Sequence, residues 1–188
     1  MKNLDIENIE KVFEKVINSS EWKLLQSYFN KNKNIYLAGN GGNSAIADHG
    51  AIDMTRHTDK NINCAGSAVL ATSIINDVGY EKWTSQWLEF SLRNRDVSDC
   101  MFIGISASGT SKNLLDALDY CKEKSVCSAF ITAKPLKIEK PSSTIVVLGV
   151  EYYHTAEVLS LMLMYELIVG SGFDCPKIKK VCNKNVSC

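Results

Sequence analysis

The sequence carries no excess of charge of either sign. Lys and Arg together number 21, as do Asp and Glu, so the formal net charge is zero. Attraction to nucleic acid or to an acidic membrane over a distance needs a strong positive field, which this composition does not provide. No nucleic-acid or membrane partner is therefore expected, and any anion that the chain binds must be held by a local site.

Long hydrophobic runs are missing as well. The longest apolar stretch, residues 158–169, is interrupted by Ser160 and Glu166 and is too short to span a bilayer. Residues 1–8 are polar and acidic, so no secretory signal is predicted. A soluble, cytoplasmic protein is expected from these two absences.

Two motif classes are absent too. None of the seven cysteines has CxxC spacing, so neither a zinc ribbon nor a redox pair is predicted, and most are interpreted as small apolar core residues. Cys182 and Cys188, in a tail rich in Lys and Asn, are candidates for exposed thiols. There is no GxxxxGK[ST] segment, which excludes a P-loop, and no nucleotide cofactor is expected.

The sequence does contain alternating helical and extended patterns. Short apolar runs predict four buried strands, at residues 34–38, 100–106, 126–132 and 144–150. Apolar residues at three- and four-residue spacing predict helices at 6–17, 22–29, 43–56, 80–92, 111–124 and 155–170. This alternation favours an α/β fold with a parallel sheet covered on both faces, in which ligands bind beyond the carboxyl ends of the strands.

A loop rich in hydroxyl groups, GISASGTS at 104–111, joins a predicted strand to a predicted helix. Its hydroxyls and the N–H groups of the helix start are neutral donors that converge on one point, and the helix dipole favours an anion there. The loop therefore predicts a site for a phosphate monoester. The alternative is a polar turn in which Ser111 is a plain helix N-cap. The four hydroxyl residues are Ser106, Ser108, Thr110 and Ser111.

Three segments together resemble the bacterial phosphoheptose isomerases, which are sugar isomerase (SIS) domain proteins. They are this loop, LAGNGGNS at 37–44 and SIINDVGY at 73–80, and the match in order and spacing runs from about residue 5 to residue 170. The resemblance implies a three-layer α-β-α sandwich with a flavodoxin-like parallel sheet, and a homotetramer or dimer with active sites between subunits. It divides the chain into N-terminal helices that pack on the core or on a partner subunit, a phosphosugar-binding domain and a tail, at 1–33, 34–172 and 173–188.

The resemblance also implies which residues bind the substrate. The counterparts of Ser106, Ser108 and Ser111 hold the phosphate, while Asn40 and Asn43 lie by the sugar. Asp77 lies in a motif near the sugar hydroxyls, although it is equally well interpreted as part of a helix C-cap loop that ends at Gly79. The full predicted binding set is Asn40, Gly41, Gly42, Asn43, Ser44, Asp77, Ser106, Ser108, Thr110 and Ser111.

An aldose–ketose isomerase needs a base that moves a proton between C1 and C2. His49 and Asp53, four residues apart, share one helix face. In the phosphoheptose isomerases this face carries a histidine and a glutamate base, so the resemblance implies that Asp53 is the base, with a side chain one methylene shorter. His154 and Glu157 form a second pair at the start of the last predicted helix.

The last helix departs from the family pattern, which has a glutamine followed eight residues later by a histidine. If Glu157 stands in the glutamine's place, Tyr165 stands in the histidine's place. A slip of one residue would put Ala156 and Met164 there instead. In either register no histidine follows His154, so the family's usual histidine is missing.

These two pairs lead to a tentative metal prediction. His49, Asp53, His154 and Glu157 would form a mixed nitrogen and oxygen site for zinc or another divalent ion. The alternative is that His49 and Asp53 form a hydrogen-bonded surface pair while His154 caps its helix.

The predicted function is isomerisation of a phosphosugar, sedoheptulose 7-phosphate or a related ketose phosphate, with Asp53, His49, His154 and Glu157 as catalytic residues. The family implies a role in heptose synthesis for lipopolysaccharide or capsule. The alternative is a non-catalytic SIS-domain protein that binds phosphosugars or is a scaffold, like the relatives that associate with a replication initiator. The missing histidine and the shorter carboxylate favour this alternative, whereas the retained serine loop and carboxylate disfavour it.

Overall fold

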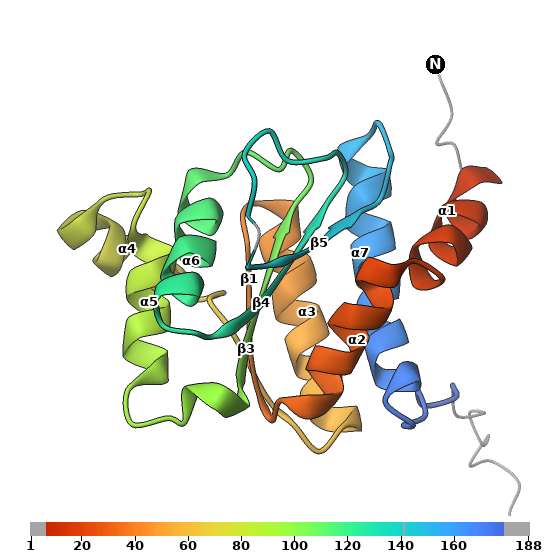
Figure 1. Cartoon of the computed structure of the whole chain (residues 1–188), viewed down its shortest axis with the longest axis horizontal. Coiled ribbons are helices and arrows are strands. Elements are labelled where there is room, and N and C mark those ends of the chain that lie inside the picture. Colours follow the sequence, from red (N-terminus) through yellow and green to blue (C-terminus); the bar gives the residue numbers. More distant parts are fainter. Residues whose placement is uncertain (1–6, 141, 179–188) are drawn as a thin grey trace, which may run out of the picture.

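A five-stranded parallel sheet forms the centre of the molecule in the computed structural model, which describes residues 7–140 and 142–178. The strand order is β2-β1-β3-β4-β5 (Figure 1). This is the flavodoxin-like order, and it confirms the predicted α/β fold. The strands are β1 (Asn34–Gly39), β2 (Asn61–Cys64), β3 (Cys100–Ser106), β4 (Cys127–Thr132) and β5 (Thr144–Val147).

Helices cover both faces of the sheet, which makes the three predicted layers (Figure 1). One face is covered by α1 (Glu7–Ile17), α2 (Ser20–Lys31), α3 (Gly42–His57) and α7 (Tyr153–Gly170). The other face is covered by α4 (Ala68–Val78), α5 (Trp83–Leu92) and α6 (Lys112–Glu123). A short 3-10 helix, Val97–Asp99, precedes β3.

The central strands are buried on both faces, so their sequences read as continuous apolar runs. Because successive side chains of a strand point to opposite faces, β1 contributes Ile35 and Leu37 to the core under α3 and α7. Its residues Tyr36 and Ala38 join the other core, under α5 and α6. The two α/β cores are thus built by the same alternation.

Two elements were not predicted, the edge strand β2 and the full length of α4. Ile62 is the buried residue of β2, while Asn61 and Asn63 are exposed, so no apolar run marks this strand. Its backbone pairs with β1 from Asn34↔Asn61 onward, and this ladder holds it in the sheet. In α4, Ile74 is the buried residue although the helix is largely apolar.

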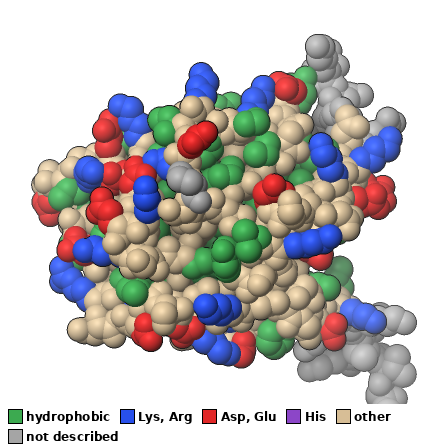
Figure 2. All heavy atoms as spheres, in the orientation of Figure 1, with side chains coloured by type: hydrophobic (Ala, Val, Ile, Leu, Met, Phe, Trp, Pro, Cys, Tyr) green, Lys and Arg blue, Asp and Glu red, His purple; other side chains and the backbone are tan. Residues whose placement is uncertain are grey.

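Within the described residues, no helix has both the length and the apolar character that crossing a bilayer requires. The cytoplasmic location stays a prediction. Basic and acidic side chains alternate over the face seen in Figure 2, in keeping with the balanced composition. Cys182 and Cys188, predicted as exposed thiols, lie outside the described residues.

Candidate functional site

The carboxyl ends of β1 and β3 lie side by side, since Gly39 pairs with Ile105 in the parallel ladder. From this point the chain continues into α3 on one face of the sheet and into α6 on the other. Such a divergence opens a crevice at the end of the sheet, where α/β proteins bind their ligands. The loop 39–42 and the serine loop, residues 104–111, therefore meet at the place where a ligand is expected.

A pair of asparagines ties these two loops together. Asn40 Nδ2 donates to Asn113 Oδ1 at 2.9 Å, and Asn113 Nδ2 donates in return to Asn40 Oδ1 at 3.1 Å. Asn113 is fully buried and also donates to Thr84 Oγ1 at 2.8 Å. Asn113 and Thr84 were not predicted, and the only signal for Asn113 was a polar residue on the apolar face of its helix. The network fixes the spacing between the loops.

The four hydroxyl groups of the serine loop are mutually hydrogen-bonded. Ser106 Oγ lies 2.9 Å from Ser111 Oγ, and Ser108 Oγ accepts from the Thr110 backbone N–H at 3.2 Å and from Thr110 Oγ1 at 3.0 Å. Gly109 has a φ of +67°, a conformation that favours glycine, and this turn folds the loop back on itself. All four predicted phosphate-binding residues are thus brought together.

Ser111 occupies the N-cap position of α6, but its side chain makes no capping hydrogen bond. Its hydroxyl is directed to Ser106 instead. This geometry disfavours the alternative of a plain N-cap, because the hydroxyl belongs to the loop cluster rather than to the helix end. The N–H groups of the first turn of α6 are then free of a side-chain cap, as an anion site at a helix start requires.

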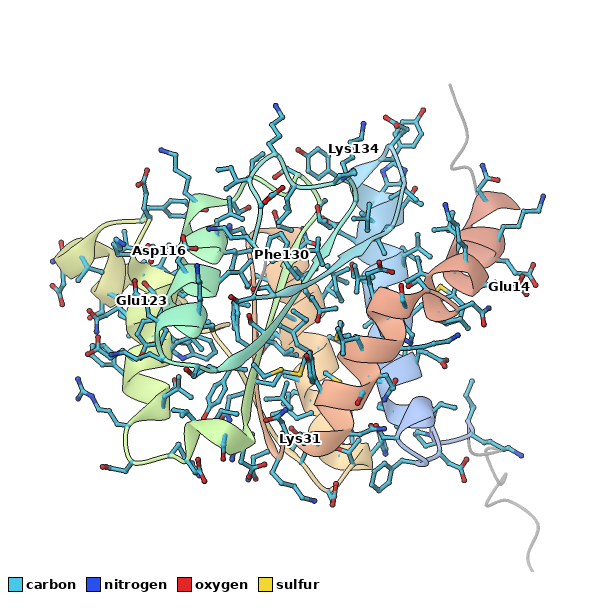
Figure 3. All side chains as sticks on the ribbon, in the orientation of Figure 1. Glu14, Lys31, Asp116, Glu123, Phe130 and Lys134 are labelled. Carbon is cyan, nitrogen blue, oxygen red and sulfur yellow. The ribbon has the colours of Figure 1, made fainter. Side chains whose placement is uncertain are left out.

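A cavity of about 200 Å³ opens beside the serine loop, lined by Ser108, Lys134, Tyr152 and Tyr153 among others. Lys134 Nζ is 2.7 Å from Glu151 Oε2. Figure 3 shows Lys134 near the start of α7, at the end of the molecule where the strands finish. A lone lysine after a strand carries no motif, so it was not predicted. A larger cavity, of about 480 Å³, is lined by residues such as Tyr28, Lys31 and Cys127 and contains none of the predicted site residues.

The predicted acid–base pair lies on α3 and gains a third member from α7. His49 Nε2 is 3.3 Å from Asp53 Oδ2 and 3.0 Å from the hydroxyl of Tyr165, which donates to Asp53 Oδ2 at 2.9 Å. Burial raises the pKa of Tyr165, and the hydrogen bond to Asp53 raises this pKa further. The phenol therefore keeps its proton near neutral pH. The side chain of Asp53 is 21% exposed and that of His49 is 57% exposed.

The packing of α7 on α3 gives Tyr165 and Met164, the two candidates for the position of the family's histidine, different surroundings. Tyr165 faces Asp53 and His49, whereas Met164 is fully buried in the core. The packing therefore places Tyr165, and not Met164, beside His49 and Asp53. Which of the two aligns with the family's histidine stays a prediction.

The second predicted pair lies at the other end of this helix contact. The Glu157 carboxylate packs against Gly42 at the start of α3, so closely that a Cβ on this glycine would collide with it. His154 is exposed and stacks on Tyr152, with ring centroids 5.5 Å apart. His154 and Glu157 are therefore near the loop 39–42, while His49 and Asp53 lie further along the helices.

The four residues of the predicted metal site are accordingly not assembled around one point. Among the described residues, no three His, Cys, Asp or Glu side chains gather closely enough to hold a metal ion. The Tyr165 hydroxyl already occupies Asp53 Oδ2, the oxygen nearest to His49. This donor set does not fit zinc, which takes three or four protein ligands, and the zinc prediction is not confirmed.

The remaining predicted residues have different environments. Asn43 is buried and its Oδ1 has no hydrogen-bond partner among the described residues, while Ser44 is half-buried on the first turn of α3. Gly41 is the N-cap residue of α3. Asp77 is exposed on the last turn of α4, where its carboxylate accepts from Asn76 Nδ2 at 3.4 Å. Its role at the site stays a prediction.

Solved structures with this architecture define the class of fold. The chain is similar to a phosphoheptose isomerase from Neisseria gonorrhoeae, with a TM-score of 0.71, 21% identity, and coverage of 88% of this chain and 90% of that one. A phosphoheptose isomerase from Francisella tularensis aligns with a TM-score of 0.67 and 15% identity, over 88% and 93% of the two chains. The fold is therefore the α/β fold of the sugar isomerase domains.

Sequence comparison points to a particular group of these proteins. Phosphoheptose isomerase 2 of Campylobacter jejuni is 35% identical over 119 residues, which are 60% of this chain and 57% of that protein. The phosphoheptose isomerase of Aneurinibacillus thermoaerophilus is 38% identical over 116 residues, 58% and 56% of the two chains. The match thus spans less than two thirds of these relatives' length, and no family model matches the chain. The resemblance to phosphoheptose isomerases is confirmed over this region.

Proposed function

We propose that the chain is a phosphosugar isomerase that interconverts a ketose phosphate and its aldose phosphate. The observation that carries this proposal is the serine loop, whose four hydroxyls meet at an uncapped helix start beside the loop 39–42. Neutral donors at a helix start bind a phosphate without a cluster of arginines. The two curated relatives described above, both named phosphoheptose isomerases, support a seven-carbon substrate such as sedoheptulose 7-phosphate.

In this proposal the phosphate replaces the contacts that the hydroxyls now make with each other. Ser106 and Ser111 turn from their mutual hydrogen bond to the phosphate oxygens, and the first N–H groups of α6 complete the site. Lys134, at the edge of the neighbouring cavity, adds a positive charge. Substrate binding therefore needs little rearrangement of the backbone.

The chemistry is assigned to the cluster on α3. The Asp53 carboxylate removes the proton from the carbon next to the carbonyl and returns it to the neighbouring carbon, which converts ketose to aldose through an enediolate. Both contacts of Asp53 fall on Oδ2, so Oδ1 is the oxygen available for this step. The imidazole of His49, on the same helix face, moves protons on and off the two sugar oxygens.

The distance between the two parts of the site favours an active site shared by two copies of the chain. Asp53 lies about three turns beyond Gly42 along α3, which at 5.4 Å a turn is about 16 Å from the loops. A fully extended chain covers at most about 3.6 Å for every three bonds, so C2 of a heptulose 7-phosphate is about 8 Å from its phosphorus. One sugar therefore cannot reach from a serine loop to Asp53 of the same chain, and we assign Asp53 to the serine loop of a neighbouring copy.

The non-catalytic alternative is less well supported. A scaffold needs neither the uncapped serine loop nor a carboxylate with a free oxygen, and the chain has both. A role in heptose synthesis for lipopolysaccharide or capsule follows from the proposed substrate. No step of the mechanism is routed through zinc, because the described donor set does not fit this ion.

The test is proton exchange followed by NMR. The protein is incubated in D₂O with sedoheptulose 7-phosphate and, separately, with pentose and hexose phosphates, and deuterium incorporation at C1 and C2 is measured. Replacement Asp53→Asn should lower the rate by about 10²- to 10⁴-fold, the usual contribution of a general base. Asp48→Asn, the same change at an exposed position of α3, is the control and should leave the rate unchanged.

Binding of phosphosugars without any exchange, in the wild type, would refute the isomerase proposal and favour the non-catalytic alternative. Exchange that survives Asp53→Asn would show that another group is the base.

A further inference from the structure

We propose that Tyr165 is the positioning residue of the catalytic base: its hydroxyl holds Asp53 by one carboxylate oxygen so that the other faces the substrate. This inference rests on the proposed function, because it concerns the same proton transfer. Tyr165 comes from α7 and Asp53 from α3, so the contact is set by the packing of two helices rather than by local sequence.

The hydrogen-bond directions in this cluster are fixed by chemistry. A carboxylate can only accept, so the single proton of the Tyr165 hydroxyl is donated to Asp53 Oδ2. Toward His49 the phenol oxygen can then only accept, which requires a hydrogen on His49 Nε2, 3.0 Å away. The three side chains thus form an ordered chain of donors from His49 through Tyr165 to Asp53.

Asp53 needs such a partner because its environment restrains it little. It lies on a helix surface, 21% exposed, and its carboxylate rotates freely about χ2 unless something holds it. The Tyr165 ring is half-buried and meets the His49 ring edge-on, with centroids 6.5 Å apart at 82°. A side chain fixed in this way is a rigid anchor, and a displacement of a catalytic group by about 1 Å costs about a hundredfold in rate.

The first test is Tyr165→Phe, which removes the hydroxyl and keeps the ring. The kcat for deuterium exchange should fall by about 10- to 100-fold. The KM should stay within about twofold, because the phosphate is held elsewhere. Tyr36→Phe is the matched control, since Tyr36 also donates its hydroxyl, to the Ser91 backbone oxygen at 3.3 Å, and lies in the other core. Its kcat should equal that of the wild type.

The second test measures the tautomer of His49, which reports on the hydrogen-bond chain directly and needs no catalytic turnover. The protein has three histidines, so ¹⁵N-labelled imidazoles give a simple spectrum, and His49→Gln assigns the signal. Neutral His49 should be the Nε2–H tautomer in the wild type, because Nε2 faces two acceptors, the Tyr165 oxygen at 3.0 Å and Asp53 Oδ2 at 3.3 Å.

An active wild type with an unchanged kcat in Tyr165→Phe would overturn the role of Tyr165 while leaving the proposed function intact. A neutral His49 in the Nδ1–H tautomer would overturn the hydrogen-bond chain. A wild type without exchange on any phosphosugar would instead overturn the proposed function, and with it the catalytic role of Tyr165.

Discussion

Two serine side chains, Ser106 at the end of β3 and Ser111 at the start of α6, show at the scale of residues how the phosphate site is preformed. Ser106 and Ser111 hydrogen-bond to each other at 2.9 Å, and Ser106 is almost fully buried. A buried hydroxyl without a partner is costly, so each hydroxyl satisfies the other until a phosphate arrives. The site is therefore stable when empty and needs only side-chain rotations to bind.

Replacing both hydroxyls, in Ser106→Ala/Ser111→Ala, should lower kcat/KM by at least about a hundredfold. Hydrogen bonds to a charged group contribute about 1.5–3 kcal/mol each, and two of them are lost. Steady-state kinetics with the best phosphosugar provides the measurement.

The chain offers a matched control for this double change. Ser128 and Ser143 are also hydrogen-bonded to each other, at 2.8 Å, and Ser128 is as buried as Ser106. This pair lies away from the carboxyl ends of the strands, because Ser128 is near the start of β4 and Ser143 directly precedes β5. Ser128→Ala/Ser143→Ala should retain the wild-type kcat/KM. Equal losses in the two double variants would mean that the serine loop has no special role.

The site residues that could be predicted from the sequence differ from those that could not in how far away along the chain their contact partners lie. The serine loop was predictable because four hydroxyls stand within six residues after an apolar run. Asn113 and Tyr165 were not assigned a role, since their partners Asn40 and Asp53 are 73 and 112 positions away in the chain. No local pattern reports such pairings, which exist only once α6 and α7 pack against their neighbours.

At the scale of elements, the junction between β1 and α3 sets the position of the loop 39–42. A Cβ on Gly39 would lie 2.5 Å from the backbone carbonyl of Asn43, on the first turn of α3. Only glycine allows the helix to start this close to the strand. The turn therefore depends on the absence of a side chain rather than on an attractive contact.

Gly39→Ala should lower the free energy of unfolding by about 1–3 kcal/mol, the usual cost of overpacking, because the backbone at Asn43 has to shift to make room for the methyl group. Gly66→Ala is the control, since the nearest atoms to its new methyl group belong to the exposed side chain of Asp48, which can move aside. Chemical denaturation of both variants measures the difference. An equal stability of the two would contradict the tight junction.

The elements that were predicted correctly are those with an unbroken apolar run or a clear helical period. β1, β3 and β4 are buried along their length and were found from composition alone. β2 was not predicted, because an edge strand needs only one buried side chain when a neighbouring strand supplies its backbone hydrogen bonds.

At the scale of the whole molecule, large apolar side chains remain exposed on the helices that carry the proposed chemistry. Ile52 on α3 is 58% exposed and Val158 on α7 is 46% exposed. An apolar surface on these helices is available for a contact between chains. It accords with the proposal that Asp53 serves the serine loop of another copy.

A mixing experiment tests this central claim most directly. Asp53→Asn and Ser106→Ala/Ser111→Ala are each expected to be nearly inactive, and the two are co-expressed with different tags and purified as mixed assemblies. If each site takes its serine loop from one copy and Asp53 from another, random association should restore about a quarter of the wild-type activity. Activity no higher than the average of the two variants alone would contradict the shared site.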